Sequence, residues 1–129
     1  MKQIVYAACI ALVLTTGAQA KKNRIDSSLD HLDPTTRLEQ LCAIEAMTRF
    51  KKDGKPYRPD RAITYALAKP TLSGHTMSGQ GGAFRSKGKW YQYSFTCSAT
   101  PDHMKVSTFT YKIGDPKPDL ASVVGGAKQ

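Results

Sequence analysis

The sequence lacks the short motifs that mark several common classes of enzyme. It has no Cys-x-x-Cys pair, which dithiol redox centres use, and no Gly-x-Ser-x-Gly, which forms the nucleophile elbow of α/β-hydrolases. No internal repeat is visible. Its 129 residues leave no room for a (β/α)₈ barrel of about 250 residues. These absences exclude several enzyme architectures and leave a single small domain.

Long hydrophobic runs are also scarce, and the longest lies near the N-terminus. The apolar stretch 4–14 follows the cation Lys2 and precedes Ala18-Gln19-Ala20, which has the small-x-small pattern that signal peptidase needs. The stretch is shorter than the roughly 20 apolar residues of a transmembrane helix. We therefore expect a signal peptide over 1–20 that is cleaved after Ala20, a mature chain without a membrane span, and a periplasmic or secreted location.

Acidic side chains are few, with 10 Asp and Glu against 19 Lys and Arg, so the formal charge is +9. Removal of the signal peptide takes away Lys2 and Cys9, which leaves 109 residues and 18 basic against 10 acidic side chains, a charge of +8. An excess of this sign favours an anionic partner. Because the chain is expected to be exported, we expect no nucleic-acid partner.

Only Cys42 and Cys97 remain in the expected mature chain. Two cysteines do not provide the four-ligand spacing of a structural zinc site, and paired cysteines are the rule in exported proteins. We predict a Cys42–Cys97 disulfide. The chain-entropy model makes a loop of this length worth about 4 kcal/mol, a large share of the net stability of a small domain.

The clearest predicted element is a helix over 34–51. Asp33 can cap its first amides, and Pro34 suits the first helical position because its missing N–H costs nothing there. The cations at the other end complement the helix dipole, and Asp53-Gly54 ends the helix. A second short helix is predicted over 61–68, with a strand over 62–67 as the open alternative.

From Thr71 onward the hydrophobic period changes to two, which predicts strands. The expected order is a strand over 72–77, a glycine-rich bulge or turn, a hairpin turn at 86–89, a strand over 90–97, and a return strand over 104–113 with a bulge near Ser107 or Thr108. Because Cys97 must reach the helix, Tyr91, Tyr93 and Phe95 are expected to face it.

These elements predict an α+β fold in which an N-terminal helix packs on a small antiparallel β-sheet and is pinned to it by one disulfide. The expected domain spans 32–114. A flexible basic N-terminus over 21–31 precedes it, and a flexible C-terminal tail over 115–129 follows it.

The candidate ligand-binding residues are basic and aromatic. Arg85, Lys87 and Lys89 cluster at the predicted hairpin beside Trp90, which is expected to be exposed. A second basic group follows the helix: Arg49, Lys51, Lys52, Lys55 and Arg58. If the two groups converge, they form an anion-binding face. The alternative is that they are solvated cations that keep a small exported protein soluble.

A phosphate loop and a metal site are both disfavoured. No helix follows the glycines at 79–82, and Gly88-Lys89 is followed by Trp90 where a P-loop has Ser or Thr. His31, His75 and His103 share no helical face or metal spacing. We therefore predict no metal and no cofactor.

His103 offers a catalytic alternative. It follows Asp102 directly, and a triad with Ser98 or Ser107 can be imagined. Adjacent side chains in a turn seldom form an oriented dyad, so a turn with local hydrogen bonds is favoured over catalysis, and no catalytic residue is assigned.

Several segments together resemble a family of exported bacterial proteins, the domain of unknown function family number 930. They are 32–42 (LDPTTRLEQLC), 59–62 (PDRA), 83–91 (AFRSKGKWY), 94–97 (SFTC), 101–106 (PDHMKV) and 109–114 (FTYKIG). The resemblance covers about 32–114. It implies an envelope protein with two paired cysteines, and it brings no established activity or catalytic residues.

The leading functional hypothesis is an exported, non-catalytic binding module for an anionic envelope component or an acidic protein. One alternative is an inhibitor of a secreted or periplasmic enzyme. The other is a small hydrolase that uses His103.

Overall fold

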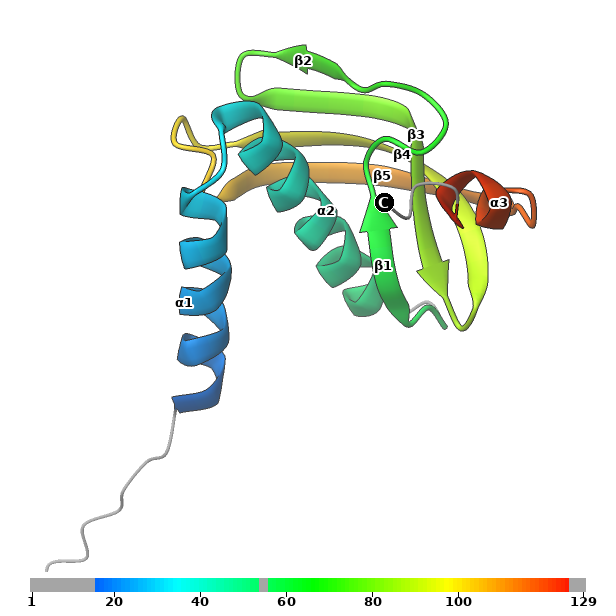
Figure 1. Cartoon of the computed structure of the whole chain (residues 1–129), viewed down its shortest axis with the longest axis horizontal. Coiled ribbons are helices and arrows are strands. Elements are labelled where there is room, and N and C mark those ends of the chain that lie inside the picture. Colours follow the sequence, from blue (N-terminus) through cyan, green and yellow to red (C-terminus); the bar gives the residue numbers. More distant parts are fainter. Residues whose placement is uncertain (1–15, 54–55, 126–129) are drawn as a thin grey trace, which may run out of the picture.

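The computed structural model describes residues 16–53 and 56–125 (Figure 1). Its helices are α1 (Thr16–Asp30), α2 (Pro34–Lys52) and α3 (Leu120–Gly125). Its strands are β1 (Pro59–Ile63), β2 (Thr71–Ser73), β3 (Thr76–Ser86), β4 (Lys89–Ala99) and β5 (Val106–Pro116). The predicted signal peptide lies outside the described residues except for 16–20, with which α1 begins.

Helix α2 confirms the predicted first helix and its local signals. The side chain of Asp33 accepts a hydrogen bond from the Thr36 N–H at 3.1 Å, and Pro34 occupies the first turn. Hydrogen bonding by the Thr36 side chain, and next by its backbone N–H, lowers the pKa of the Asp33 carboxyl. At the other end the Asp53 N–H donates to the carbonyl of Arg49. A cap at each end explains why the helix begins and ends where the sequence predicts.

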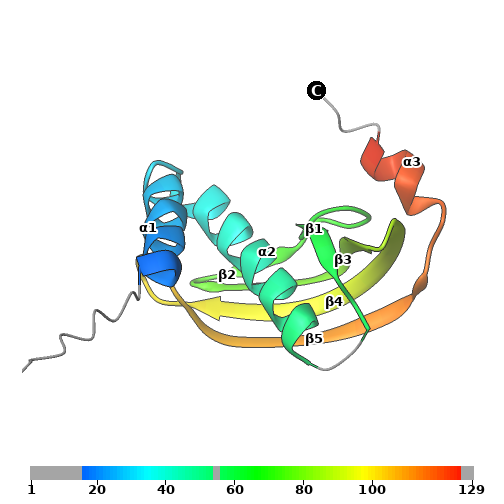
Figure 2. The same ribbon diagram turned by 90° about the horizontal axis from the view of Figure 1, so that it is seen from below.

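The strands form one antiparallel sheet in the order β1-β3-β4-β5, with β2 added beside β3. The sheet curves around α2, which lies on its concave face (Figure 2). Between them is the main core, built around Leu38 and Phe50 of α2 and Phe84, Tyr93 and Phe95 of the sheet. Helix plus sheet in two layers confirms the α+β prediction, and Tyr93 and Phe95 face the helix as expected.

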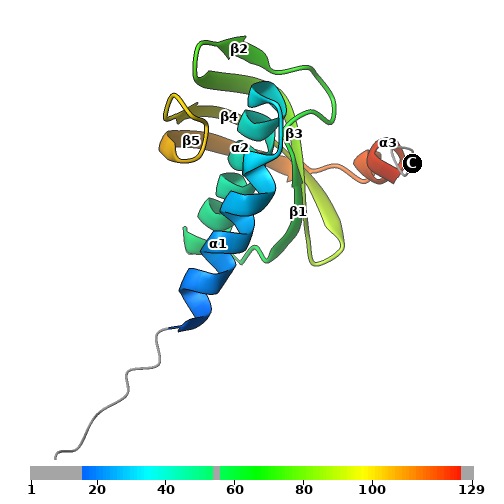
Figure 3. The same cartoon turned by 60° about the vertical axis from the view of Figure 1, so that its left-hand side comes forward.

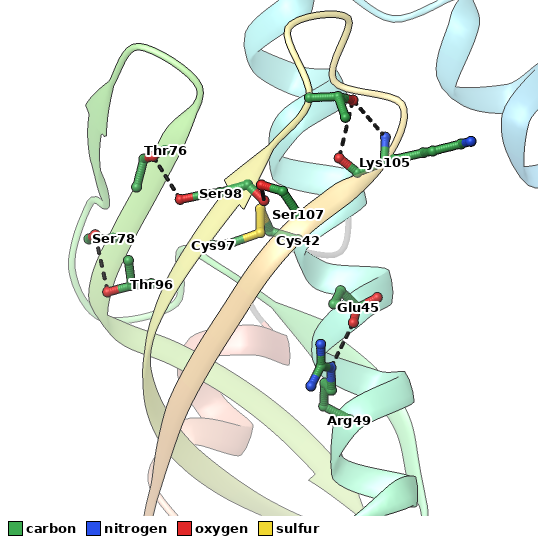
Figure 4. The surroundings of a disulfide bond; sticks show 11 residues. Cys42, Glu45, Arg49, Thr76, Ser78, Thr96, Cys97, Ser98, Lys105 and Ser107 are labelled. Atoms are coloured by element: carbon green, nitrogen blue, oxygen red, sulfur yellow. Dashed lines mark hydrogen bonds and ion pairs between the residues drawn. A yellow bond between two sulfur atoms is a disulfide. The ribbon is translucent and has the colours of Figure 1, made fainter.

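The predicted disulfide is present. Cys42 of α2 and Cys97 of β4 are bonded, their Cα atoms are 6.0 Å apart, and neither residue is exposed to solvent (Figure 4). The bridge therefore joins the middle of the helix to a central strand.

The glycine-rich stretch is a β-bulge inside β3, as the sequence analysis favoured over a phosphate loop. The register shifts between Gly79, which pairs with Phe95, and Gly82, which pairs with Tyr93. A Cβ on Gly82 would lie 2.7 Å from the Tyr93 ring, so only glycine leaves room for that buried ring. The predicted bulge in β5 is also confirmed, because the pairing skips Ser107.

Two local predictions are wrong. The helix predicted over 61–68 does not form. Residues 59–63 form strand β1, and residues 64–68 have no regular secondary structure. The open alternative, a strand, is right for Ala62 and Ile63, which pair with β3. Ala66 and Leu67 then donate their N–H groups to one carbonyl, that of Gly81.

The second error is the single strand predicted over 72–77. It is instead a hairpin of β2 and β3, which turns at Gly74 and His75. Gly74 has a φ of +59°, a conformation that glycine adopts without strain.

Helices extend beyond both predicted ends of the domain. Residues up to Asp30 of the predicted N-terminal segment 21–31 belong to α1, and its Leu29 is buried in the main core. The first turns of α1 extend away from the sheet (Figure 3). Within the predicted tail over 115–129, β5 continues to Pro116 and α3 follows, with Leu120 and Val124 buried, and residues 126–129 lie outside the described residues.

We predict that Gly82→Ala destabilises the fold by about 1–3 kcal/mol, because the new methyl group overpacks the Tyr93 ring. The matched control is Gly114→Ala, whose Cβ would meet nothing closer than 3.4 Å. We expect this control to change stability by less than about 0.5 kcal/mol. Urea unfolding measures both, and equal stabilities of the two variants would contradict the assignment of the bulge.

Candidate functional site

The side chain of Arg85 forms an ion pair with a carboxylate of the same domain instead of extending freely into solvent. It lies in β3 and forms a two-pronged ion pair with Asp60 of β1, with its Nε 2.9 Å from Oδ1 and its Nη2 2.7 Å from Oδ2. The guanidinium also lies 5.7 Å from the centroid of the Trp90 ring. The ion pair lowers the pKa of the Asp60 carboxyl and raises the pKa of Arg85. Arg85 therefore joins β1 to β3, and Asp60 neutralises its charge.

Trp90 is buried, so the expectation that it is exposed is wrong. Only 8% of its surface is accessible, because Leu120 and Val124 of α3 pack against it together with Ala83. This small second core lies on the face of the sheet opposite α2. Trp90 thus holds the C-terminal helix and does not offer a stacking surface to a ligand.

Lys87 occupies the tip of the β3–β4 hairpin. Lys87 and Gly88 have φ values of 51° and 77°, which is the left-handed pair of a tight two-residue turn. Ser86 precedes the turn, and its hydroxyl accepts the Arg58 N–H at 2.8 Å. The turn is therefore fastened to the loop that follows α2.

The fastened loop brings members of the two predicted basic groups together. Lys51 of α2, Arg58 of the loop and Lys87 of the turn line one hollow of about 670 Å³, which we call the basic groove; Pro56, Tyr57 and Pro59 complete its lining. All three charged residues among these lining residues are cations. The Tyr57 ring packs edge-on against Phe84 and Tyr91, so the main core holds it in place.

Among the described residues, the other predicted cations do not line the groove. Lys89 and Lys52 are exposed elsewhere, and Arg49 pairs with Glu45 at 2.8 Å within α2. Lys55 lies outside the described residues. Of the candidate set Arg85, Lys87, Lys89 and Trp90, the structure thus places only Lys87 in the groove.

A second hollow lies on the open face of the sheet, and sequence reasoning missed it. Strand register aligns hydroxyl side chains in two rows, one of them Thr71, Ser78, Thr96 and Thr110 and the other Ser73, Thr76, Ser98 and Thr108. Figure 4 shows the hydrogen-bonded pairs Thr76–Ser98 and Ser78–Thr96. The hollow measures about 660 Å³, and Lys69 and Lys112 are its charged lining residues.

The structure also joins two histidines that are far apart in the sequence. His75 lies in the β2–β3 turn and His103 in the β4–β5 turn, and their ring nitrogens Nδ1 and Nε2 are 3.0 Å apart. The pairing of Thr76 with Ser98 brings both turns to the same end of the sheet. No local sequence signal could reveal this contact.

The geometry around Asp102 gives no support to a hydrolase that uses His103. The carboxylate of Asp102 accepts from the Thr100 hydroxyl and the Met104 N–H, and these bonds lower its pKa. His103 bonds instead to His75 and to the carbonyl of Pro34. The Ser107 hydroxyl donates to the Ser98 carbonyl.

The fold and the site define a small disulfide-bonded α+β domain with a basic groove at one end of its helix. A family model, Domain of Unknown Function (DUF930), matches residues 29–121, and the chain belongs to this family. No curated protein and no solved structure matches the chain. Among the helices that the structure describes, none has the length and apolar character to cross a membrane.

We predict that Asp60→Asn lowers stability at pH 7 and that this effect is smaller at pH 2. The Asp60 pKa is lowered in the folded state, so its contribution is present above the ordinary value of about 4 and is lost as the pH falls through the lowered value. Urea unfolding of both proteins at the two pH values measures this. A difference that is the same at both pH values would show that the ion pair is not its source.

Proposed function

We propose that the mature chain is an exported, non-catalytic binding module that holds an anionic ligand in the basic groove. The single observation that supports this most is the convergence of Lys51, Arg58 and Lys87, three cations from three separate elements, on one hollow. Cations gathered in a concave surface concentrate their field and attract anions. Solubility alone would not require the three cations to lie around one hollow.

The groove favours a ligand that carries several negative charges. Its cations come from the end of α2, the following loop and the hairpin tip. Pro56, Pro59 and Tyr57 give it a stiff wall, and a preformed wall lowers the ordering cost of binding. A run of carboxylates in an acidic protein or the phosphates of an anionic envelope component would match these charges.

The groove is a better candidate than the hydroxyl rows on the open face. Lys69 and Lys112 stand there among uncharged side chains, several of which already bond to one another. The inhibitor of a secreted or periplasmic enzyme stays a prediction from the sequence, with no particular contact in its favour.

The test compares two triple variants with the same loss of charge. Lys51→Ala/Arg58→Ala/Lys87→Ala removes the groove cations, whereas Lys89→Ala/Lys105→Ala/Lys117→Ala removes three exposed lysines elsewhere. The probes are a fluorescein-labelled deca-glutamate peptide and vesicles that contain phosphatidylglycerol. We expect the groove variant to weaken binding of at least one probe by about tenfold or more, and the control by less than about threefold.

Raising the salt concentration from 50 to 500 mM is expected to weaken binding of the wild type, because the ions screen exposed charges. Equal losses in the two triple variants would show that only net charge matters and would overturn the assignment to the groove. Binding that does not respond to salt would contradict an electrostatic ligand altogether.

A further inference from the structure

The contact between His75 and His103 is built by three separate segments. The Nδ1 of His75 lies 3.0 Å from the Nε2 of His103, and the two rings are inclined by 74°. The second ring nitrogen of His103, Nδ1, lies 2.7 Å from the carbonyl oxygen of Pro34, in the first turn of α2. His103 is buried, whereas His75 is exposed and gives the pair access to solvent.

The contact with Pro34 indicates which ring nitrogen of His103 carries a hydrogen. A carbonyl oxygen can only accept a hydrogen bond, so the Nδ1 of His103 carries a hydrogen that it donates to Pro34. The Nε2 of a neutral His103 therefore presents its lone pair to His75. Histidines that bind metals show this arrangement, in which the outer ring N–H donates to a carbonyl or carboxylate and the inner nitrogen binds the ion.

The backbones of both histidines are held in place as well. The His75 carbonyl accepts the Ala99 N–H, and the His103 N–H donates to the Thr100 carbonyl, both at 2.9 Å. His103 has a φ of 57°, a left-handed conformation that residues other than glycine seldom adopt. Residues other than glycine that are held in such conformations are found in turns and at functional sites. The two rings are therefore held near each other before any ion binds, in contrast to a single histidine on the surface.

We propose that His75 and His103 bind one divalent transition-metal ion, of the class that contains Cu²⁺ and Zn²⁺. Such ions bind imidazole nitrogen at about 2.0–2.1 Å, so two nitrogens on one ion lie about 3 Å apart, close to the separation of this pair. The ion binds to the Nδ1 of His75 and the Nε2 of His103, beside the line that joins them, and replaces the hydrogen bond between the rings. The hydrogen of a neutral His75 then lies on Nε2 instead of Nδ1. Binding of the ion therefore neither releases nor takes up a proton.

The site supplies two protein ligands, and water fills the other positions. Within the described residues, no third His, Cys, Asp or Glu joins the pair to form a larger ligand group. Cys42 and Cys97 are bridged to each other, so their sulfurs do not compete for the ion. Two imidazoles without carboxylates select borderline ions over Mg²⁺ or Ca²⁺, which prefer oxygen.

The experiment titrates the protein, purified without a histidine tag, with CuCl₂ at pH 7.5. Calorimetry gives the stoichiometry and affinity, and electron paramagnetic resonance identifies nitrogen ligands. We expect one Cu²⁺ per chain with imidazole nitrogen coupling, no binding of Mg²⁺, and a loss of about tenfold or more in affinity for His75→Ala. The matched control is His31→Ala, which removes another exposed histidine and should leave Cu²⁺ binding unchanged.

His75→Ala is the decisive variant, because the His75 side chain is exposed and its loss should leave the fold intact. Circular dichroism checks the fold of the variant. His103→Gln is the second variant, and it should also weaken the binding of Cu²⁺ if it folds. Cu²⁺ affinity that His75→Ala leaves intact would overturn the proposal. So would the absence of any binding to the wild type at millimolar Cu²⁺, which would leave the pair as a hydrogen bond that joins two turns.

Discussion

The bond between Cys42 and Cys97 is the constraint on which the rest of the structure depends. It fastens the middle of α2 to the centre of the sheet and so sets where both ends of the helix lie. The first turn reaches the β4–β5 turn, where the Pro34 carbonyl meets His103. The last turn reaches the β3–β4 hairpin, where Lys51 faces the same groove as Lys87. One helix, held at its centre, thus positions both candidate sites.

Glycine is the second constraint, because the aromatic core leaves no room for a side chain at Gly79 and Gly82 of β3. The rings of Tyr93 and Phe95 lie against Gly82 and Gly79, and the bulge between these glycines changes the register of the strand. Beyond the bulge, Phe84 continues the main core, while Ala83 faces the small core of Trp90 and α3. The sheet can therefore pack against helices on both faces at this end and leave its hydroxyl rows open at the other.

Features set by neighbouring residues could be predicted from the sequence. Asp33-Pro34 marks the start of α2, Lys87-Gly88 makes the hairpin turn, and the phase change at Ser107 marks the bulge in β5. Features that depend on distant partners could not. Strand β1 forms because β3 pairs with it, and the C-terminal helix α3 is buried only through its contact with Trp90.

The same distinction between features set by neighbouring residues and features that depend on distant partners applies to the candidate sites. The sequence supplied Lys51, Arg58 and Lys87 as members of two basic groups, but only the folded chain shows that these three converge and that Arg85 does not join them. The contact of His75 with His103 depends on the strand register, which brings their two turns together. Their separation in the sequence does not match a metal-binding pattern, so the sequence could not predict the contact.

The central claim is that the groove at the end of α2 binds the anionic ligand. Nuclear magnetic resonance of the ¹⁵N-labelled protein, titrated with the deca-glutamate peptide, tests it most directly. We expect the largest amide shifts to fall on Lys51, Tyr57, Arg58 and Lys87. Shifts concentrated on Ser78, Thr96 and Thr110 of the open face, or spread evenly over all exposed lysines, would contradict it.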